Sequence, residues 1–359
     1  MMRDHEKLNS VHCMRFLAAA AVVVHHVTTG LGNRSVMVGA AGVDVFFIIS
    51  GIVIGLALIK EEGAYAFAVK RVIRVMPMYW LATAIYAFFR FGVWGEQPPL
   101  DLVWRSLLLI PHFGTNWNPI YFPAWTLTFE MLFYVVATVA LLIYRHHAFA
   151  TCLVLFLAIG VLRIAVPGST TGAIFSTGIC LEFCAGMLIA QLIAKEILPR
   201  RQFGTICILV ALGLLWKFQS AVVIIREDPL AFHLARPLEL GIPAALLVWG
   251  VLSFEDSPVF QGRFLQLGGA ASYSIYLTHI ITIDFTRDRL ARWGVQAMEH
   301  AASMTCMLVA LSLIVGIAVH RYVELPLLNW LKNALLSHRS DDHQHVSVSL
   351  SAEPIDTPH

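Results

Sequence analysis

Charged residues are scarce in this chain. Only 13% of its 359 residues are Asp, Glu, Lys or Arg, whereas 58% are hydrophobic and the mean hydropathy is +0.72. A soluble domain carries roughly 25% charged residues, so this composition excludes an ordinary water-facing surface. Lipid is the natural surrounding for such a chain, because apolar runs of about 20 residues match the hydrocarbon thickness of a bilayer.

Other absences narrow the class further. The net charge is only +2, so no nucleic-acid partner is expected. The six cysteines form no CxxC pair. Cys180 and Cys184 lie one helical turn apart in an apolar run, where packed membrane cysteines are favoured over a metal pair. No metal site is therefore predicted. No internal repeat is visible, which weakens the hypothesis of an inverted-repeat transporter.

Long apolar runs dominate what is present. They cover residues 11–29, 41–59, 76–91, 124–144, 148–166, 175–194, 203–218, 235–253, 271–286 and 302–323. This pattern predicts an all-α, polytopic membrane helix bundle with about ten transmembrane helices. The Pro- and Trp-rich segment 92–123 is expected to form a folded or re-entrant cap. We expect one membrane domain over residues 1–332 and a disordered polar tail over residues 333–359.

The orientation follows from Lys and Arg in the short loops. If the N-terminus is inside, more of these residues fall on the cytoplasmic side, although the outer side also holds several, including Arg287, Arg289 and Arg292. The bias is moderate. It predicts that both termini lie in the cytoplasm.

The first run contains two residues that are costly in lipid, Arg15 and His26. They are eleven residues apart, which places them about 20° from alignment on one helix face and about 16 Å apart along the axis. His25 points about 100° away from that face. A functional pair is the favoured interpretation. The alternative is that Arg15 snorkels inward while His26 marks the outer interface.

The second run begins with the segment Gly42-Val-Asp44 and continues to Ser50-Gly51. Asp44 is suited to orient a histidine or to bind a cation, but it is also an ordinary acid for a helix N-terminus. Ser50 and Gly51 allow close approach of another backbone or of a ligand.

Three further charges stand at membrane positions. Arg71 and Arg74 are three residues apart and therefore share a helix face, and their forks suit phosphate oxygens. The alternative is ordinary positive-inside flanking. Glu130 lies among apolar residues, so it needs a cationic partner, either His26 or an arginine, unless it is protonated.

Polar residues also occur near the end of the chain. His279 lies in an apolar stretch, where a histidine is more often structural than functional. Arg321 and Glu324 are three residues apart before Pro326, and this spacing predicts an ion pair in the surface layer at a helix end.

In their order along the chain, these segments resemble the membrane-bound acyltransferase-3 family. The matching segments are Arg15 with His26, Gly42 to Gly51, Arg71 to Arg74, Trp125 to Tyr134, Ser272 to His279, and Glu324 to Pro326. Each motif alone is weak, but six in order are specific, and they span about residues 10–330. Within the family, segments such as Leu181 to Ala190 are most similar to exopolysaccharide O-acetyltransferases of the succinoglycan type. Phe16 and Leu132 replace a glycine and a glutamine that are usual in the family.

The resemblance implies an O-acyltransferase of the bacterial inner membrane, surrounded by membrane lipid. It would move an acyl group, with acetyl expected, from acyl-CoA to a hydroxyl of an exopolysaccharide or lipid-linked oligosaccharide. No permanently bound cofactor is implied. Two alternatives stay open at this point. One is a proton-coupled transporter of a sugar or anion, and the other is a structural partner in a polysaccharide export complex.

The resemblance also implies roles for the residues named above. His26 would be a general base or a transient acyl carrier, with Glu130 or Asp44 fixing its tautomer. Arg71 and Arg74 would hold the donor phosphates, with Ser50 beside them. Arg15 would bind donor phosphate or set the local potential.

Overall fold

The computed structural model describes residues 8–31, 37–93, 95, 99–110, 119–165, 177–218, 235–294 and 301–336. These residues form helices and no strand. The long helices are α1 (Asn9–Gly30), α2 (Gly42–Ile59), α3 (Ala64–Ala87), α5 (Trp125–Ile143), α6 (Ala148–Ala165), α7 (Thr177–Ala194), α8 (Arg201–Phe218), α12 (Arg263–Arg292) and α13 (Ala301–Val319). The shorter elements include η1 (Met37–Ala41), α4 (Leu100–Leu107), η3 (Phe122–Ala124), η4 (Arg145–His147), η6 (Pro237–Gly241), α11 (Ile242–Leu252), η8 (His320–Glu324) and α14 (Leu325–Leu336).

The all-α membrane bundle predicted from hydropathy is confirmed, whereas the number of spans is not. Each of the ten apolar runs overlaps a helix. Six helices are long and apolar enough to cross a membrane, and three further apolar helices among the described residues are shorter. The count of about ten therefore stays a prediction. Large apolar side chains such as Leu142, Leu209 and Ile314 lie exposed on the outside of the bundle, where lipid would cover them.

The predicted start of the third span is wrong by about three turns. The apolar run begins at Met76, but α3 begins at Ala64 and continues through Pro77. Hydropathy marks the apolar part of a helix, while the helix itself extends as far as its backbone hydrogen bonds continue. Arg71 and Arg74 consequently lie within a long helix rather than in a flanking loop.

The described part of the segment 92–123 folds back on α3, as a cap would. In this part the short helix α4 is followed by residues 108–110. The indole of Trp80 donates a hydrogen bond to the carbonyl of Leu107 at 2.8 Å, and the hydroxyl of Tyr79 donates to that of Ser106. The Ser106 hydroxyl in turn accepts from the amide of Ile120 at 3.0 Å. These bonds tie the cap to the helix that carries the two arginines.

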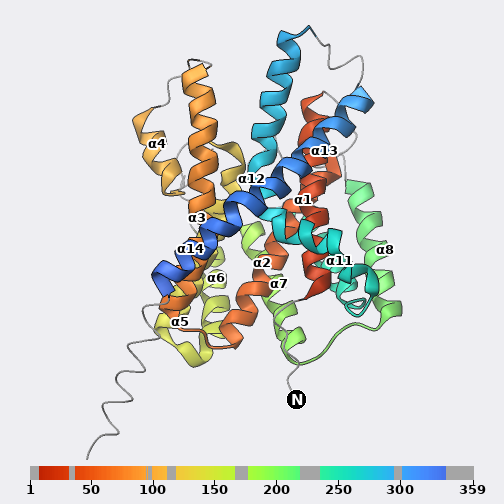
Figure 1. Ribbon diagram of the computed structural model, residues 1–359. Coiled ribbons are helices and arrows are strands. Elements are labelled where there is room, and N and C mark those ends of the chain that lie inside the picture. The colour runs from red at the N-terminus through yellow and green to blue at the C-terminus, as the bar shows by residue number, and fades with distance from the viewer. Residues whose placement is uncertain are drawn as a thin grey trace, which may run out of the picture.

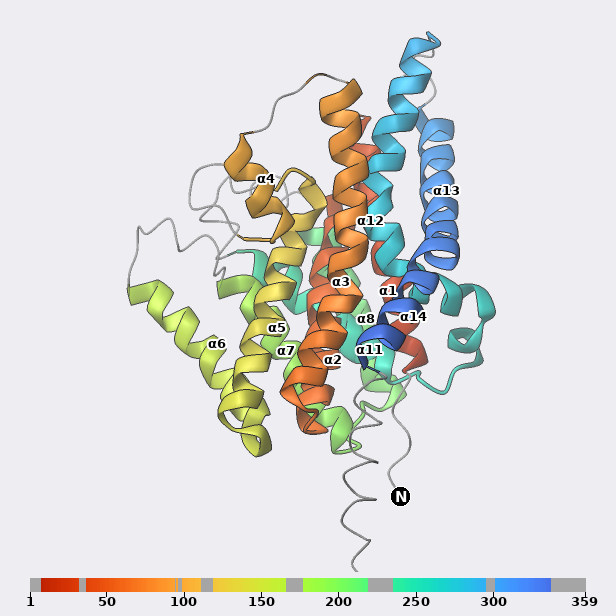
Figure 2. The same ribbon diagram turned by 60° about the vertical axis from the view of Figure 1, so that its left-hand side comes forward.

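The helices pack as a bundle in which segments distant in sequence are neighbours (Figure 1). The most extensive pairings are α2 with α7, α1 with α12, α12 with α13, and α8 with α11. α2 and α7 touch at glycines, because a side chain at Gly51 would collide with the carbonyl of Phe183 and with Gly186. The close backbone approach that Ser50-Gly51 predicted is therefore present. In the turned view α6 diverges from the bundle at its edge (Figure 2).

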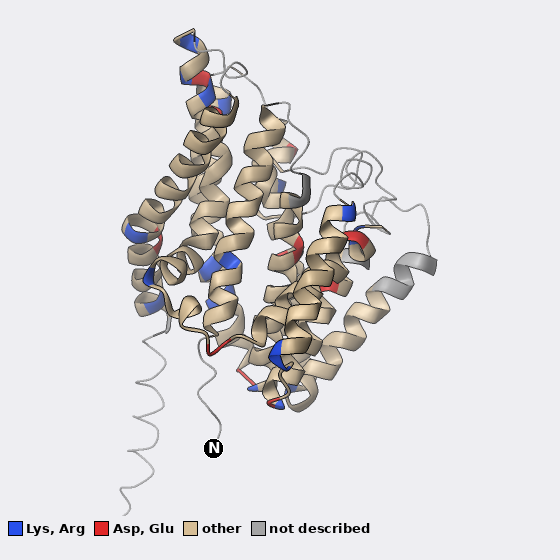
Figure 3. Cartoon of the chain, turned by 90° about the vertical axis from the view of Figure 1, so that its right-hand side faces the viewer, with Lys and Arg blue, Asp and Glu red and all other residues tan. Residues whose placement is uncertain are grey.

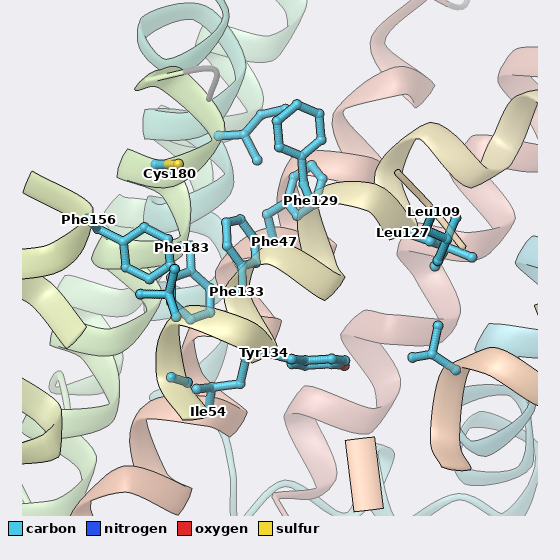
Figure 4. Close-up of a cluster of buried hydrophobic side chains, with 14 of the residues drawn as sticks. Phe47, Ile54, Leu109, Leu127, Phe129, Phe133, Tyr134, Phe156, Cys180 and Phe183 are labelled. Carbon is cyan, nitrogen blue, oxygen red and sulfur yellow. The ribbon is translucent and has the colours of Figure 1, made fainter. Parts of the chain in front are cut away.

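An aromatic cluster holds α2, α5, α6 and α7 together (Figure 4). Phe133 of α5 stacks on Phe183 of α7 with ring centroids 4.2 Å apart, and Phe156 of α6 and Phe47 of α2 pack edge-on against Phe133. Cys180 and Cys184 are buried in the same cluster. The prediction of packed cysteines is confirmed. Because this side of the bundle is closed by apolar contacts, any polar chamber must lie on the other side of α2 and α5.

Charges gather at the ends of the helices, and only a few lie inside the bundle (Figure 3). The lower end in Figure 1 contains the start of α1, the α2–α3 turn and η4. Arg145 of η4 donates to the carbonyl of Glu61 at 2.6 and 2.9 Å, and His146 pairs with the Glu61 carboxylate. We refer to this as the lower end below. α14 ends at Leu336, and the predicted tail beyond it falls outside the described residues.

Candidate active site

A cavity of about 120 Å³ lies between α1, α2, α3, α5 and α12. Five of the residues singled out in the sequence line it, together with four aromatic or hydroxyl side chains of α5 and α12: Arg15, Ser50, Arg71, Arg74 and Glu130, with Tyr134, Ser272, Tyr273 and Tyr276. We call it the arginine cavity. Three guanidinium groups in a small chamber create a strongly positive space, which suits phosphate oxygens.

Arg74 is held in place by carboxylate and imidazole groups from the end of the chain. It pairs with Glu324, which also accepts hydrogen bonds from Ser274 at 2.7 Å and His320 at 2.7 Å. Glu324 is completely buried. The predicted surface pair between Arg321 and Glu324 is therefore wrong. Residues 320–324 form a π-helical turn that points Glu324 into the bundle, where a cation 250 positions away neutralises it.

Arg71 is held less firmly. Its guanidinium lies over the rings of Phe67 and Tyr134, 5.2 and 5.8 Å from their centroids, and its Nε has no hydrogen-bond partner among the described residues. Tyr134 donates a hydrogen bond to Glu130. Of the two partners expected for Glu130, the structure thus favours the arginines, since they share its cavity. Arg71 is stacked on aromatic faces, and its fork is available to a ligand.

A second cavity of about 610 Å³ adjoins the first at Arg15 and Val53, which line both. It opens at the lower end between α1, α2 and α3, and its lining includes His12, Lys60 and Lys70. Lys70 pairs with Glu62 at its rim. We call it the lower vestibule. The two cavities together give a positively lined route from the lower end to Arg15.

Asp44 is placed elsewhere. Its two carboxylate oxygens accept hydrogen bonds from Arg236 at 2.9 and 2.7 Å, and both residues are buried. Glu182 of α7 is buried next to this pair, and its carboxylate packs against Gly241. Asp44 does not line the arginine cavity, and it does not orient His26. That hypothesis is wrong because both Asp44 oxygens are bound to an arginine 192 positions away.

His26 lies near the other end of α1, outside the lining of the arginine cavity. Its Nδ1 donates to the carbonyl of Val22 at 3.0 Å, so the backbone fixes its tautomer and Nε2 carries the lone pair. Its ring lies 5.0 Å from that of His279 and 5.1 Å from that of His25. His279 in turn lies 5.6 Å from the ring of Tyr276, which lines the cavity. Imidazoles and arginines thus flank one aromatic side chain.

Sequence reasoning missed several of these residues. Glu182 is an acid inside an apolar run, so the criterion that selected Glu130 also applied to it. Arg236 was assigned only to a span end, yet it is buried against Asp44. No local signal distinguishes Ser272 or Tyr276 from other polar residues of helix α12. Only their position beside the cavity does so.

The chain matches the acyltransferase-3 family, described as an acyltransferase domain, over residues 8–321. A helical membrane bundle with arginines around an inner cavity and paired imidazoles beside it is consistent with that class. The chain belongs to this family, and it is a multi-pass membrane acyltransferase. The family therefore favours an enzyme over the transporter and export-partner alternatives.

Among curated proteins, the chain is similar to the exopolysaccharide production protein ExoZ of Rhizobium meliloti strain 1021. The two are 33% identical over 322 residues, which cover 86% of this chain and 93% of ExoZ. No solved structure matches the chain significantly.

Proposed function

We propose that this protein is an O-acyltransferase that moves an acyl group, with acetyl expected, from acyl-CoA to a hydroxyl of an exopolysaccharide or its lipid-linked precursor. The single observation that carries the proposal is the arrangement along α1. Arg15 lines the arginine cavity near the lower end, and His26 lies about 16 Å further along the helix. Coenzyme A has the same polarity, because its phosphates and its thioester sit at opposite ends of an extended arm.

The lower vestibule and the arginine cavity support the donor part of the proposal. His12, Lys60 and Lys70 line the vestibule, and Arg15 connects it to the cavity. A positively lined channel with low-dielectric walls concentrates an anionic ligand. Within the cavity, Arg71 is the residue that we assign to direct phosphate binding, since Arg74 is already paired with Glu324. Ser50 would contribute a hydroxyl from α2.

The acceptor part rests on the relative. ExoZ is an exopolysaccharide production protein by its name, and we extend that substrate class to this chain. A growing glycan is assembled on lipid carriers at the membrane, so a membrane enzyme can meet it there. We further propose that the lower end faces the cytoplasm of a bacterial inner membrane, with both termini on that side, so that acyl-CoA enters from below and the acceptor from the other side.

The chemical step we propose is direct transfer with His26 as general base. The acceptor oxygen attacks the thioester carbon, a C–O bond forms and the C–S bond breaks. Nε2 of His26 takes the hydroxyl proton and returns it to the thiolate, which leaves as coenzyme A thiol. The bond from Nδ1 to Val22 favours this route over a covalent carrier. A carbonyl cannot accept that proton, so acylation at Nε2 would leave a positively charged acyl-imidazole.

The test compares wild type with His26→Ala at equal membrane levels. The O-acetyl content of the surface glycan is measured by proton NMR, and coenzyme A release is measured in membrane vesicles supplied with acetyl-CoA. We expect the variant to lose acylation by about 10²-fold or more, the usual contribution of a positioned base. Equal acetylation in both strains would refute the role of His26. Vesicles of the wild type that neither bind nor consume acetyl-CoA would refute the donor.

A further inference from the structure

The surroundings of His26 raise a question that the proposed reaction leaves open. A general-base histidine becomes positively charged when it takes a proton, and a carboxylate on the far side of the ring commonly stabilises that charge. Here Nδ1 of His26 bonds to a neutral carbonyl, and Asp44 is bound to Arg236. Glu130 bonds to Tyr134 in the arginine cavity, whose lining does not include His26. Some other group must respond to the new charge.

His279 is the side chain placed to respond. It belongs to α12, which packs along α1, and it is completely buried. Its Nδ1 donates to the carbonyl of Tyr276 at 2.5 Å, so its Nε2 carries a lone pair and can only accept. That Nε2 has no hydrogen-bond partner among the described residues. A buried acceptor without a donor costs about 1–3 kcal/mol, so its retention points to a donor that is present at another stage.

The two rings explain why that donor is absent at rest. Their centroids are 5.0 Å apart and their planes are inclined by 60°. Each Nδ1 holds the ring proton against a backbone carbonyl, so each Nε2 is an acceptor, and two acceptors cannot bond to each other. One additional proton changes this, because Nε2–H of one ring can then donate to Nε2 of the other.

We propose that His279 is the proton partner of His26, a positioning residue whose Nε2 accepts the hydrogen bond of the imidazolium formed when His26 takes the acceptor's proton. The inference rests on the proposed acyl transfer and deepens it. No extra reactant is needed. The proton leaves the acceptor hydroxyl, is shared between two Nε2 atoms while the C–S bond breaks, and ends on the thiolate.

A purely structural role makes a different prediction, and two substitutions separate the roles. Asparagine places an amide N–H near the position of Nδ1, so His279→Asn keeps the bond to Tyr276 and loses the acceptor at Nε2. Glutamine places its amide group near Nε2, so His279→Gln keeps an acceptor there and loses the bond to Tyr276. Proton partnership ranks Gln above Asn in transfer rate, whereas a structural role ranks Asn above Gln.

The experiment uses membrane vesicles with native acceptor and radiolabelled acetyl-CoA. It measures kcat and KM for the donor, and it measures retention of coenzyme A. We expect His279→Asn to lower kcat by about 10²-fold, His279→Gln to lower it by at most about 10-fold, and the donor KM to change less than about twofold in both. His147→Asn, at an exposed histidine of η4, is the matched control and should equal wild type.

Two results would overturn the inference: Asn transferring as fast as Gln or faster, or a loss of transfer that parallels a loss of coenzyme A retention. A wild type that retains no coenzyme A and transfers no acyl group contradicts the proposed function itself, so the two failures are distinguishable.

Discussion

Two groups of charges lie inside this helix bundle, and they differ in what their arginines touch. Arg236 is buried, bonds to both oxygens of Asp44, and lies beside Glu182. Arg71 lines a cavity, lies over aromatic rings, and has an Nε without a partner among the described residues. The first arrangement already satisfies its charge within the protein, and the second leaves binding capacity for a ligand.

The comparison shows that a charge inside a membrane helix does not by itself identify a catalytic residue. Sequence reasoning treated Asp44 and Arg71 alike, because both are costly in lipid. The structure separates them by their partners. We therefore expect changes at Asp44 and Arg236 to affect stability, and changes around the arginine cavity to affect the donor.

The largest effect is expected for Arg236→Met. The substitution leaves Asp44 and Glu182 buried together without their cation, and breaking a buried ion pair on one side costs about 3–5 kcal/mol. The thermal midpoint of the detergent-solubilised protein and its yield as a single species should both fall sharply. The double variant Arg236→Met with Asp44→Asn is the control, and it should recover most of the loss. A normal thermal midpoint together with absent acyl transfer would place this pair in the active machinery instead.

An intermediate effect is expected for Arg71→Lys. Lysine keeps the charge but loses the fork that bonds to phosphate oxygens and stacks on Phe67 and Tyr134. Charge-assisted hydrogen bonds contribute about 1.5–3 kcal/mol, so the KM for acetyl-CoA should rise by about 10- to 100-fold with an unchanged thermal midpoint. Arg74→Lys is the matched comparison, and it should raise the KM less, because Arg74 already pairs with Glu324. Equal KM values for Arg71→Lys and wild type would make Arg71 a topology signal only.

The smallest effect is expected for Lys70→Gln at the rim of the lower vestibule. The Lys70–Glu62 pair is largely exposed on the lysine side, at 52%, so its loss changes stability by about 0–1 kcal/mol. The value of kcat/KM for acetyl-CoA should fall about twofold at low salt, and the difference should disappear at high salt because the attraction is screened. Lys195→Gln, at an exposed lysine outside both cavities, should show no such salt dependence.

Much of the fold followed from patterns that act within one helix. The apolar runs located the helices, and the eleven-residue spacing gave Arg15 and His26 a shared side of α1. The three-residue spacing placed Arg71 and Arg74 on one side of α3, and both line the arginine cavity. Helix periodicity alone determines these relations.

The relations between helices did not follow in the same way. Glu324 was expected to pair with Arg321 three positions before it, yet it pairs with Arg74 and His320. Asp44 was expected near His26, yet Arg236 holds both of its oxygens. Spacing along one helix does not specify the rotation or depth of a neighbouring helix, so the partner of a buried charge depends on how the helices pack.

The sequence by itself determined that this protein is a membrane helix bundle, which side chains share a helix face, and which family motifs occur in order. Only the tertiary structure decided which arginines are neutralised and which line a cavity, and that the fully buried His279 lies beside His26. The physical reason is range. Backbone hydrogen bonding fixes geometry over a few turns, whereas buried charges and imidazoles are matched across helices by packing, through contacts between residues as far apart as 250 positions.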